Sequence, residues 1–200
     1  MIIERTGKTI IIDPRDIESG QEYKASVAYF GGTFDPFHIG HFLVTKELCS
    51  SFDEVWIHPH SFTKPKKPIE LSHRQNIVLL GIKNLERAFL MRYHPELAPD
   101  AYYLPHFLEG QVKDLEFSDV IGNDHLDRLI SAGIERPLYC FSKSADFSPS
   151  VFHPAIVYMV ANSAGINATE IRIRIQKNDF DNLALQDEVL DYIKQNRLYI

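Results

Sequence analysis

Cysteine is scarce in this sequence of 200 residues, which contains only two. Cys49 and Cys140 lie far apart and outside any CxxC pattern, which excludes a disulfide framework and a cysteine-rich zinc site, so we expect both thiols in the core. His58 and His60 form an H-x-H pair, but no carboxylate or cysteine stands nearby at metal-ligand spacing. We therefore predict no protein-bound metal.

Long apolar runs are missing as well. None approaches the roughly 20 residues that a membrane-spanning helix needs. Residues 1–12 carry Glu4, Arg5 and Lys8 and so lack the uninterrupted apolar core of a secretory signal. The sequence therefore predicts a cytoplasmic protein with no membrane partner.

Basic residues are outnumbered, with 21 Lys and Arg against 27 Asp and Glu and a net charge of −6. Nonspecific binding to nucleic acid relies on a basic surface, so we expect no nucleic-acid partner. A chain of this length is enough for one domain that buries roughly 70% of its extended surface. We predict that domain over residues 25–200, after an extension of residues 1–24.

The most distinctive stretch is residues 31–41, which read Gly-Gly-Thr-Phe-Asp-Pro-Phe-His-Ile-Gly-His. The apolar and aromatic run before it, Ala25 to Phe30, is typical of a buried strand in a parallel sheet. Gly31 and Gly32 end that strand, because glycines adopt backbone angles that other residues avoid and let N–H groups approach a polyphosphate closely. The pattern predicts a phosphate site at a strand-to-helix turn.

A helix is predicted to begin near Phe37 to Ile39, because Pro36 disfavours helix in the residue before it. The positive end of the helix dipole and its first N–H groups then lie at the turn. His38 and His41 are three positions apart, so in the first helical turn they share a face and can reach one anion. The alternative for such a pair is a surface or capping role.

The whole string resembles the HxGH signature of the nucleotidylyltransferase superfamily, and its opening is most similar to the nicotinate (nicotinamide) mononucleotide adenylyltransferases. The resemblance implies an α/β fold with a Rossmann-like, doubly wound, mostly parallel sheet and helices on both faces. It also implies that ATP and a pyridine mononucleotide are joined with loss of pyrophosphate, with Mg2+ carried on ATP and no covalent enzyme intermediate.

The resemblance also assigns residues of this string. It makes His38 and His41 the catalytic pair and places Asp35 in the acceptor site. It implies ATP contacts for the turn and for the helix start, at Gly31, Gly32, Thr33, Phe34 and Gly40.

The chain continues in the pattern of a βαβ unit. The helix runs through Leu48, is broken by Ser50 to Asp53, and is followed by a predicted strand, Glu54 to Ile57. Such units are parallel and right-handed, and ligands bind at the carboxyl ends of their strands. Two later β-prone runs, Pro137 to Phe141 and Ala155 to Val160, extend the alternation of strands and helices.

The loop from Pro59 to Pro68 brings lysines to the carboxyl end of the second strand. By the resemblance, Lys66 has the spacing of an acceptor-site lysine; a solvated charged loop is the alternative. Ser72 and Gln75 fit a capping box that opens the next helix. Arg74 then lies in the first turn, where a cation is mildly unfavourable, and the resemblance places it in the acceptor site.

Residues Phe117 to Asp124 read as a strand that runs into a glycine turn. Asp124 resembles the aspartate that contacts the nucleotide ribose in the family, and a carboxylate accepts well from two neighbouring hydroxyls. Its alternative role is to cap a helix over Leu126 to Ile130. The segment between, residues 91–112, departs most from the family in the region that shapes the pyridine pocket. The choice between nicotinate and nicotinamide mononucleotide therefore stays open.

Residues 165–172 resemble the ISSTxIR motif of the family, with Asn167 and Ala168 in place of its two serines. By this resemblance Ile166, Thr169 and Arg172 belong to the ATP site, and the loss of a hydroxyl at position 168 removes one phosphate contact. Asn167 can still cap a helix, with Glu170 three positions later. Alternating isoleucines also fit a strand; we choose the helix.

The two ends carry less information. Thr9 to Ile12 is predicted as a short strand, and the extension that contains it leaves three roles open: an edge strand, a contact in a homo-oligomer, or a mobile arm. Val189, Leu190 and Ile193 stand at helical spacing near the other end and predict simple packing. The closing Tyr-Ile-x-x-x-x-Leu-Tyr pattern resembles the nicotinate branch without implying a site.

Other functions share parts of this pattern. A sister transferase acting on phosphopantetheine, or on an alcohol phosphate with CTP, shares the first motif. An aminoacyl-tRNA synthetase would fit His-Ile-Gly-His and a phosphate contact at Lys143, but the chain is short and acidic for a tRNA partner. A non-catalytic nucleotide sensor is a third alternative. A metal-dependent hydrolase is disfavoured because carboxylate ligands are missing.

Overall fold

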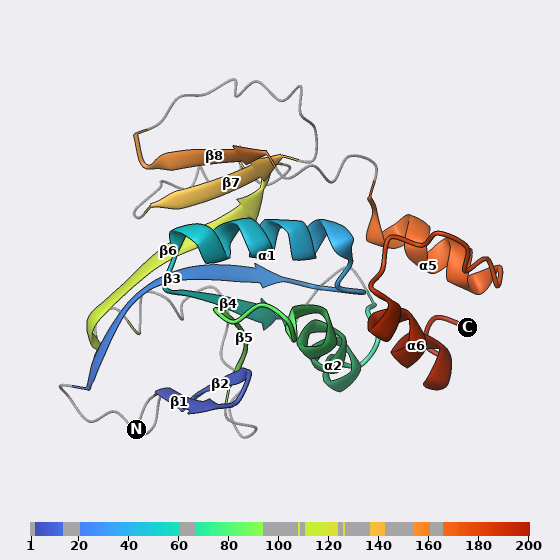
Figure 1. Cartoon of the computed structure of the whole chain (residues 1–200), viewed down its shortest axis with the longest axis horizontal. Helices are drawn as coiled ribbons and strands as arrows, with labels where there is room; N and C mark the ends of the chain where they lie inside the picture. Colours follow the sequence, from blue (N-terminus) through green and yellow to red (C-terminus); the bar gives the residue numbers. More distant parts are fainter. Residues whose placement is uncertain are drawn as a thin grey trace.

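The computed structural model describes residues 3–13, 21–60, 67–93, 108, 111–123, 126, 137–142, 154–160 and 166–200. These residues form one sheet with helices packed against it (Figure 1). Its strands are β1 (Ile3–Thr6), β2 (Thr9–Ile12), β3 (Glu22–Gly32), β4 (Glu54–Pro59), β5 (Ala88–Tyr93), β6 (Lys113–Gly122), β7 (Leu138–Ser142) and β8 (Ile156–Val160). The described helices are α1 (Ile39–Ser51), α2 (Leu71–Ile82), α5 (Ala168–Gln176) and α6 (Asp187–Gln195).

The strand order is β1-β2-β5-β4-β3-β6-β7-β8, and every neighbouring pair is parallel except β1 with β2. From β3 the chain adds β4 and β5 on one side and then β6, β7 and β8 on the other. This is the doubly wound order of a Rossmann-like fold, as the sequence predicts. Its switch point lies between β3 and β6, and in such sheets ligands bind outside the carboxyl ends of the strands at that point.

Side chains alternate across the sheet, so each face has its own core. Ala28 and Phe30 of β3 belong to the core cluster that also holds buried residues of α1, α2, α5 and α6. Val27 and Tyr29 point to a second cluster with Trp56 and Phe117. The described helices therefore share one face. The helix predicted over Leu126 to Ile130, after Asp124, lies almost wholly outside the described residues.

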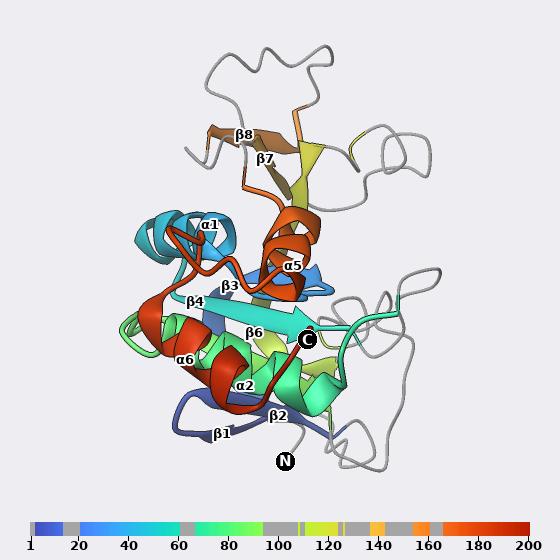
Figure 2. The same cartoon turned by 90° about the vertical axis from the view of Figure 1, so that its right-hand side faces the viewer.

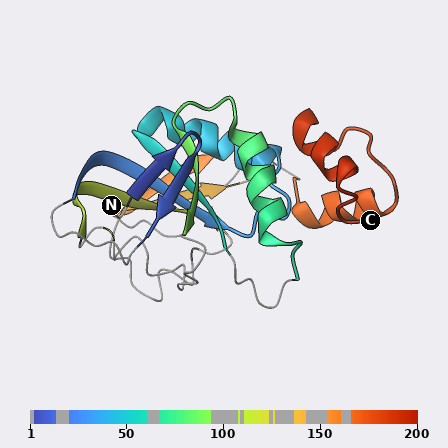
Figure 3. The same ribbon diagram turned by 90° about the horizontal axis from the view of Figure 1, so that it is seen from below.

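The last two helices lie beyond the ends of the central strands. Figure 2 looks onto the carboxyl ends of β3 and β4 and shows α5 and α6 in front of them. Figure 3 shows the same two helices past one end of the sheet and the β1–β2 hairpin at its edge. None of the described helices is long and apolar enough to cross a membrane.

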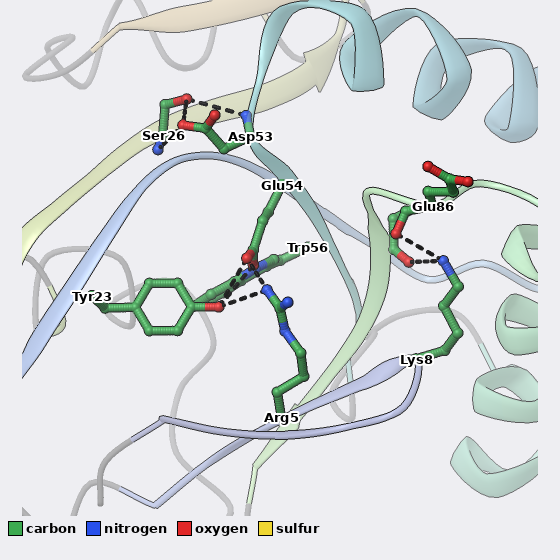
Figure 4. Close-up of polar contacts among 9 residues, drawn as sticks. Arg5, Lys8, Tyr23, Ser26, Asp53, Glu54, Trp56 and Glu86 are labelled. Atoms are coloured by element: carbon green, nitrogen blue, oxygen red, sulfur yellow. Dashed lines mark hydrogen bonds and ion pairs between the residues drawn. The ribbon is translucent and has the colours of Figure 1, made fainter.

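The predicted strand Thr9 to Ile12 is confirmed as β2, and of the three roles left open for the extension the structure shows the edge strand, which is β1. Thr9 to Ile12 pairs in parallel with β5, and β1 folds back on it through a turn at Gly7, whose φ of 58° favours glycine. Arg5 of β1 reaches the buried carboxylate of Glu54, which also accepts from Tyr23 and from Trp56 Nε1 at 2.7 Å (Figure 4). These contacts fasten the hairpin to the amino end of β4.

Most predicted element positions are confirmed. Helix α1 begins at Ile39, within the predicted start, and β4 begins at Glu54. The predicted capping box at Ser72 is wrong, because the N-cap of α2 is Glu70, two residues earlier, and it makes no side-chain cap. The backbone N–H of Arg74 closes the first turn on the carbonyl of Glu70, so Ser72 is already inside the helix.

Candidate active site

The last two residues of β3, Gly31 and Gly32, make close contacts and have no unusual backbone angles. A Cβ on Gly31 would lie 2.5 Å from His60 Nε2, and one on Gly32 would lie 3.0 Å from the Phe34 ring. Neither glycine has a positive φ; Phe34 has one instead, at 49°. The predicted unusual backbone angles of Gly31 and Gly32 are therefore wrong, while the lack of a side chain leaves room for the rings of His60 and Phe34.

His38 and His41 cap α1 reciprocally. Gly40 N–H donates to His38 Nδ1 at 3.1 Å, and His38 N–H donates to His41 Nδ1 at 3.2 Å. The rings stack with centroids 3.8 Å apart. A ring nitrogen that accepts carries no proton, so we assign the proton of each neutral imidazole to Nε2. The capping alternative is therefore real, and it leaves both histidines as Nε2–H donors.

Aromatic rings surround His41, the second histidine of the predicted catalytic pair. The ring centroids of Phe34, Phe37 and Phe30 lie 5.0, 5.4 and 6.1 Å from that of His41. Phe37 is itself pressed against α2, where a Cβ on Gly81 would come within 2.5 Å of it. This packing restricts the imidazole to one orientation, which preorganisation of a donor requires.

The first N–H groups of α1 are used within the protein. Ile39 N–H donates to the carbonyl of Ala184 at 2.9 Å, and that of Gly40 goes to His38. The sequence predicts these groups as anion donors at the turn. These two N–H groups already have partners within the protein, while the positive end of the helix dipole still lies at this end of α1.

Asp35 joins the motif loop to α5. Its backbone carbonyl accepts from Arg172 Nη1 at 2.6 Å, and its carboxylate lies 3.6 Å from the same nitrogen. Arg172 Nη2 donates to Thr169 Oγ1 at 3.2 Å. Arg172 thus contacts Asp35, 137 positions away in the sequence, and also Thr169. Arg172 and Thr169 were predicted for the ATP site and Asp35 for the acceptor site.

The helix predicted after Asn167 is confirmed as α5, and the strand alternative is wrong. Asn167 is its N-cap, and Asn167 Oδ1 accepts from Thr169 N–H at 2.8 Å. Ile171 and Ile175 face the core cluster, and Ile166 packs against it before the helix. Asparagine therefore replaces the family serine as a cap, and Thr169 lies exposed at the helix start.

Arg74 is almost fully buried, with 2% of its surface exposed. Its guanidinium donates to the carbonyl of Ile69 at 3.0 Å, of Thr33 at 2.8 Å and of His60 at 2.9 Å. Burial lowers the pKa of Arg74, and the nearby Asp35 carboxylate opposes that shift. Arg74 thus ties the loops after β3 and β4 together, and its contact with an acceptor stays a prediction.

His58 and His60 are held neutral at the end of β4. His58 Nδ1 lies 2.7 Å from the hydroxyl of Tyr29. Burial, and then the neighbouring His60, lowers the pKa of His58 to about 3. Burial, and then Arg74, lowers the pKa of His60 to about 4. Within the described ranges, no three metal-ligating side chains come together.

Some predicted residues cannot be placed. Lys66, Asp124 and Lys143 lie outside the described residues, so their predicted contacts stay predictions. One residue of the site was missed: Tyr199 donates to Asp35 Oδ1 at 2.8 Å. The similarity of the closing Leu-Tyr to the family was the signal, but spacing along the tail indicated only packing.

A family model described as cytidylyltransferase-like matches residues 29–174. This range runs from β3 to α5 and includes Asp35, the histidine pair and Arg172. The chain belongs to the cytidylyltransferase-like family.

Curated relatives cover nearly the whole of this cytidylyltransferase-like chain. It is 30% identical over 193 residues to the probable nicotinate-nucleotide adenylyltransferase of Bacillus licheniformis, with 86% of this chain and 97% of that protein covered. It is 25% identical over 196 residues to the nicotinate-nucleotide adenylyltransferase of Bacillus subtilis, with the same shares covered.

Solved structures share the fold. The nicotinic acid mononucleotide adenylyltransferase of Plasmodium falciparum, complexed with NaAD, superposes with a TM-score of 0.71 at 20% identity and covers 88% of this chain and 98% of that one. The same enzyme complexed with APC gives 0.70 at 19% identity, over 88% and 97% of the two chains. The doubly wound arrangement of this cytidylyltransferase-like protein is therefore that of its structural neighbours.

Proposed function

We propose that this protein is a nucleotidyltransferase of NAD biosynthesis that joins ATP to nicotinate mononucleotide, or to nicotinamide mononucleotide, giving the dinucleotide and pyrophosphate. The observation that carries the proposal is the direct contact of Arg172 with Asp35, three residues before the histidine pair. It brings the two diagnostic stretches of the chain to one place, at the carboxyl ends of the strands. The curated relatives carry the name of this reaction.

The chemistry needs positioning and charge stabilisation more than a nucleophile from the protein. The 5′-phosphate of the acceptor is already ionised, so it can attack the α-phosphorus of ATP in line while pyrophosphate leaves. The Nε2–H groups of His38 and His41 would donate to the α-phosphate as charge develops there. Thr169 and Arg172 would hold the leaving pyrophosphate.

The remaining predicted roles follow the same logic. Backbone N–H groups near Gly32 and Thr33 would contact the phosphates, and Asp124 would accept from the ribose hydroxyls. Lys66 would offset acceptor charge. Arg74 would act by holding the loops on which these groups stand.

We propose that Mg2+ enters as part of the ATP substrate. The carboxylate that the described site offers, Asp35, already interacts with Tyr199 and Arg172. Mg2+ commonly keeps waters and binds substrate phosphate oxygens. The donor set of the described site therefore does not fit a resident Mg2+. Cytoplasmic location and the lack of a nucleic-acid partner also stay predictions from the sequence.

The test is pyrophosphate release by the purified protein with ATP and Mg2+, compared among nicotinate mononucleotide, nicotinamide mononucleotide and no acceptor. We expect release with a pyridine mononucleotide and none without it, and the better acceptor fixes the specificity. CTP in place of ATP, and phosphopantetheine as acceptor, serve as controls. Binding of ATP without release for either mononucleotide would contradict the proposal and favour a sensor or another acceptor.

A further inference from the structure

The chain reverses sharply after α6, in a segment that the predicted mechanism leaves unused. Arg197 and Tyr199 have φ values of 51° and 67°, in the left-handed region that residues with a Cβ rarely adopt. Leu198 between them is buried in the core cluster, and its N–H bonds to the carbonyl of Ile193 at 3.0 Å. The burial of Leu198 thus stabilises an unfavourable backbone conformation, and this conformation turns the side chain of Tyr199 toward Asp35.

That side chain ends on the motif loop. The Tyr199 hydroxyl donates to Asp35 Oδ1 at 2.8 Å, and Ile69 N–H reaches the same oxygen at 3.4 Å. Burial raises the pKa of Tyr199, and the Asp35 carboxylate raises it further, so the hydroxyl keeps its proton. A protonated phenol beside a carboxylate is a fixed donor.

The contact is one end of a chain of polar groups. Asp35 Oδ2 faces Arg172 Nη1 at 3.6 Å, while Arg172 Nη2 donates to Thr169 Oγ1. Asp35 is nearly buried, at 9% exposure, so its two oxygens are constrained from both sides. A hydrogen bond that holds Asp35 Oδ1 therefore also sets the direction in which Oδ2 faces Arg172.

We propose that Tyr199 is a positioning residue for adenylyl transfer: by donating to Asp35 it orients the carboxylate that, together with the backbone carbonyl of Asp35 at 2.6 Å, sets where the Arg172 guanidinium presents its donors to the phosphates of ATP. The inference rests on the proposed function. Left-handed backbone at two of three consecutive residues is the kind of strain that persists where a site over-determines the structure.

Tyr199→Phe removes the hydroxyl and keeps the ring. We expect kcat to fall roughly 10-fold, the scale of one hydrogen bond to a charged group. KM for the acceptor should change little, because Arg172 is directed at the leaving pyrophosphate. The melting temperature, measured alongside, shows whether the variant is folded.

Tyr192→Phe is the matched control. Tyr192 lies on α6, and its hydroxyl meets His73 and Asn76 of α2, each at 2.9 Å, instead of Asp35. Its loss should leave kcat and both KM values unchanged. If Tyr199 contributed only to packing, Tyr199→Phe and Tyr192→Phe would have the same kcat and KM values.

A double-mutant cycle with Arg172→Lys decides whether Tyr199 acts through Arg172. We expect Tyr199→Phe to have little further effect in the Arg172→Lys background. The inference would be overturned if Tyr199→Phe left kcat unchanged, or if it lowered kcat equally in the wild-type and Arg172→Lys backgrounds. Activity of the wild type would still support the proposed function in either case. Wild type that is inactive with both pyridine mononucleotides would overturn the proposed function and the inference with it.

Discussion

At the scale of single residues, each histidine of the pair has two roles on two different atoms. Nδ1 accepts a backbone N–H and caps α1, which leaves Nε2, to which we assign the proton, to donate in the proposed mechanism. The same substitution therefore affects stability and chemistry together, unless the replacement keeps one atom and removes the other. Asparagine resembles the Nδ1 side of histidine, and glutamine resembles the Nε2 side.

His41→Ala is expected to lower kcat by about 100- to 1000-fold, the cost of removing one preorganised donor at a developing charge. His41→Asn should lower kcat equally while it keeps the cap, so its melting temperature should stay nearer that of wild type. Steady-state kinetics and thermal unfolding measure the two effects. Wild-type turnover in a folded His41→Asn would remove His41 from the mechanism.

His73→Ala is the control for this pair of variants. His73 lies on α2, and its Nδ1 meets the hydroxyl of Tyr192 at 2.9 Å. Its removal should change kcat little. A large decrease in kcat of His73→Ala would mean that histidine substitutions lower kcat by destabilising the fold.

The buried His58 predicts a pH-dependent stability. The pKa of His58 is about 3 in the folded chain and 6.5 in the unfolded chain. Below pH 6.5 the unfolded state therefore binds a proton that the folded state does not bind. Stability is complete above pH 6.5 and is lost as pH falls, by roughly 2 kcal/mol for this residue between pH 6.5 and 5. Urea unfolding at several pH values measures the slope.

His58→Asn keeps an acceptor for Tyr29 but has no titrating group. We expect its free energy of unfolding to depend less steeply on pH than that of wild type, with His60 accounting for part of the remaining slope. Parallel pH profiles of wild type and variant would show that His58 is not the titrating residue.

At the scale of elements, the hairpin is held to the sheet by a polar contact at the far end from the site. Glu54 accepts from Tyr23, Trp56 and Arg5. Glu54→Gln should lower the free energy of unfolding by about 2 kcal/mol, because these bonds lose a charged acceptor. The kcat value should not change. Glu4→Gln, on the exposed side of β1, is the control and should leave both unchanged.

Periodicity and capping residues predict elements well where they act locally. Helix α1 and strand β4 begin where Pro36 and Glu54 indicate, and Asn167 starts α5. The start of α2 was wrong because Arg74 fastens that turn to carbonyls from other loops. Contacts of this kind are invisible in a local pattern.

The site shows the same division. The histidine pair and Arg172 were predicted because each stands in a local string that resembles a family. Tyr199 was missed because its partner, Asp35, is 164 positions away. Its spacing along the tail fits a packing residue, and only the reversal after α6 brings its hydroxyl to the motif loop.

At the scale of the whole molecule, ATP is expected to stabilise the fold by binding segments from both ends of the domain. With Mg2+ and ATP at about 100 times Kd, linkage gives about 2.7 kcal/mol. For a chain of this size that raises the melting temperature by roughly 5–10 °C. Arg172→Ala should reduce the shift measured by thermal unfolding.

Arg174→Ala is the matched control on the same helix. Arg174 pairs with Asp179 at 2.8 Å on the surface, two positions from Arg172. It should lose little of the ATP-dependent shift. Equal losses in both arginine variants would mean that α5 acts through its overall charge.

The hairpin at the edge of the sheet also bears on the order of assembly. Strands β1 and β2 can pair as soon as they exist, since four residues on each side meet across one turn. Their attachment must wait for β5, because Lys8 meets the carbonyl of Ala88 80 positions further along the chain. Closing so long a loop is entropically costly, so we expect the hairpin to dock late and to detach first. Its amides should exchange with solvent deuterium sooner than those of β3 and β4.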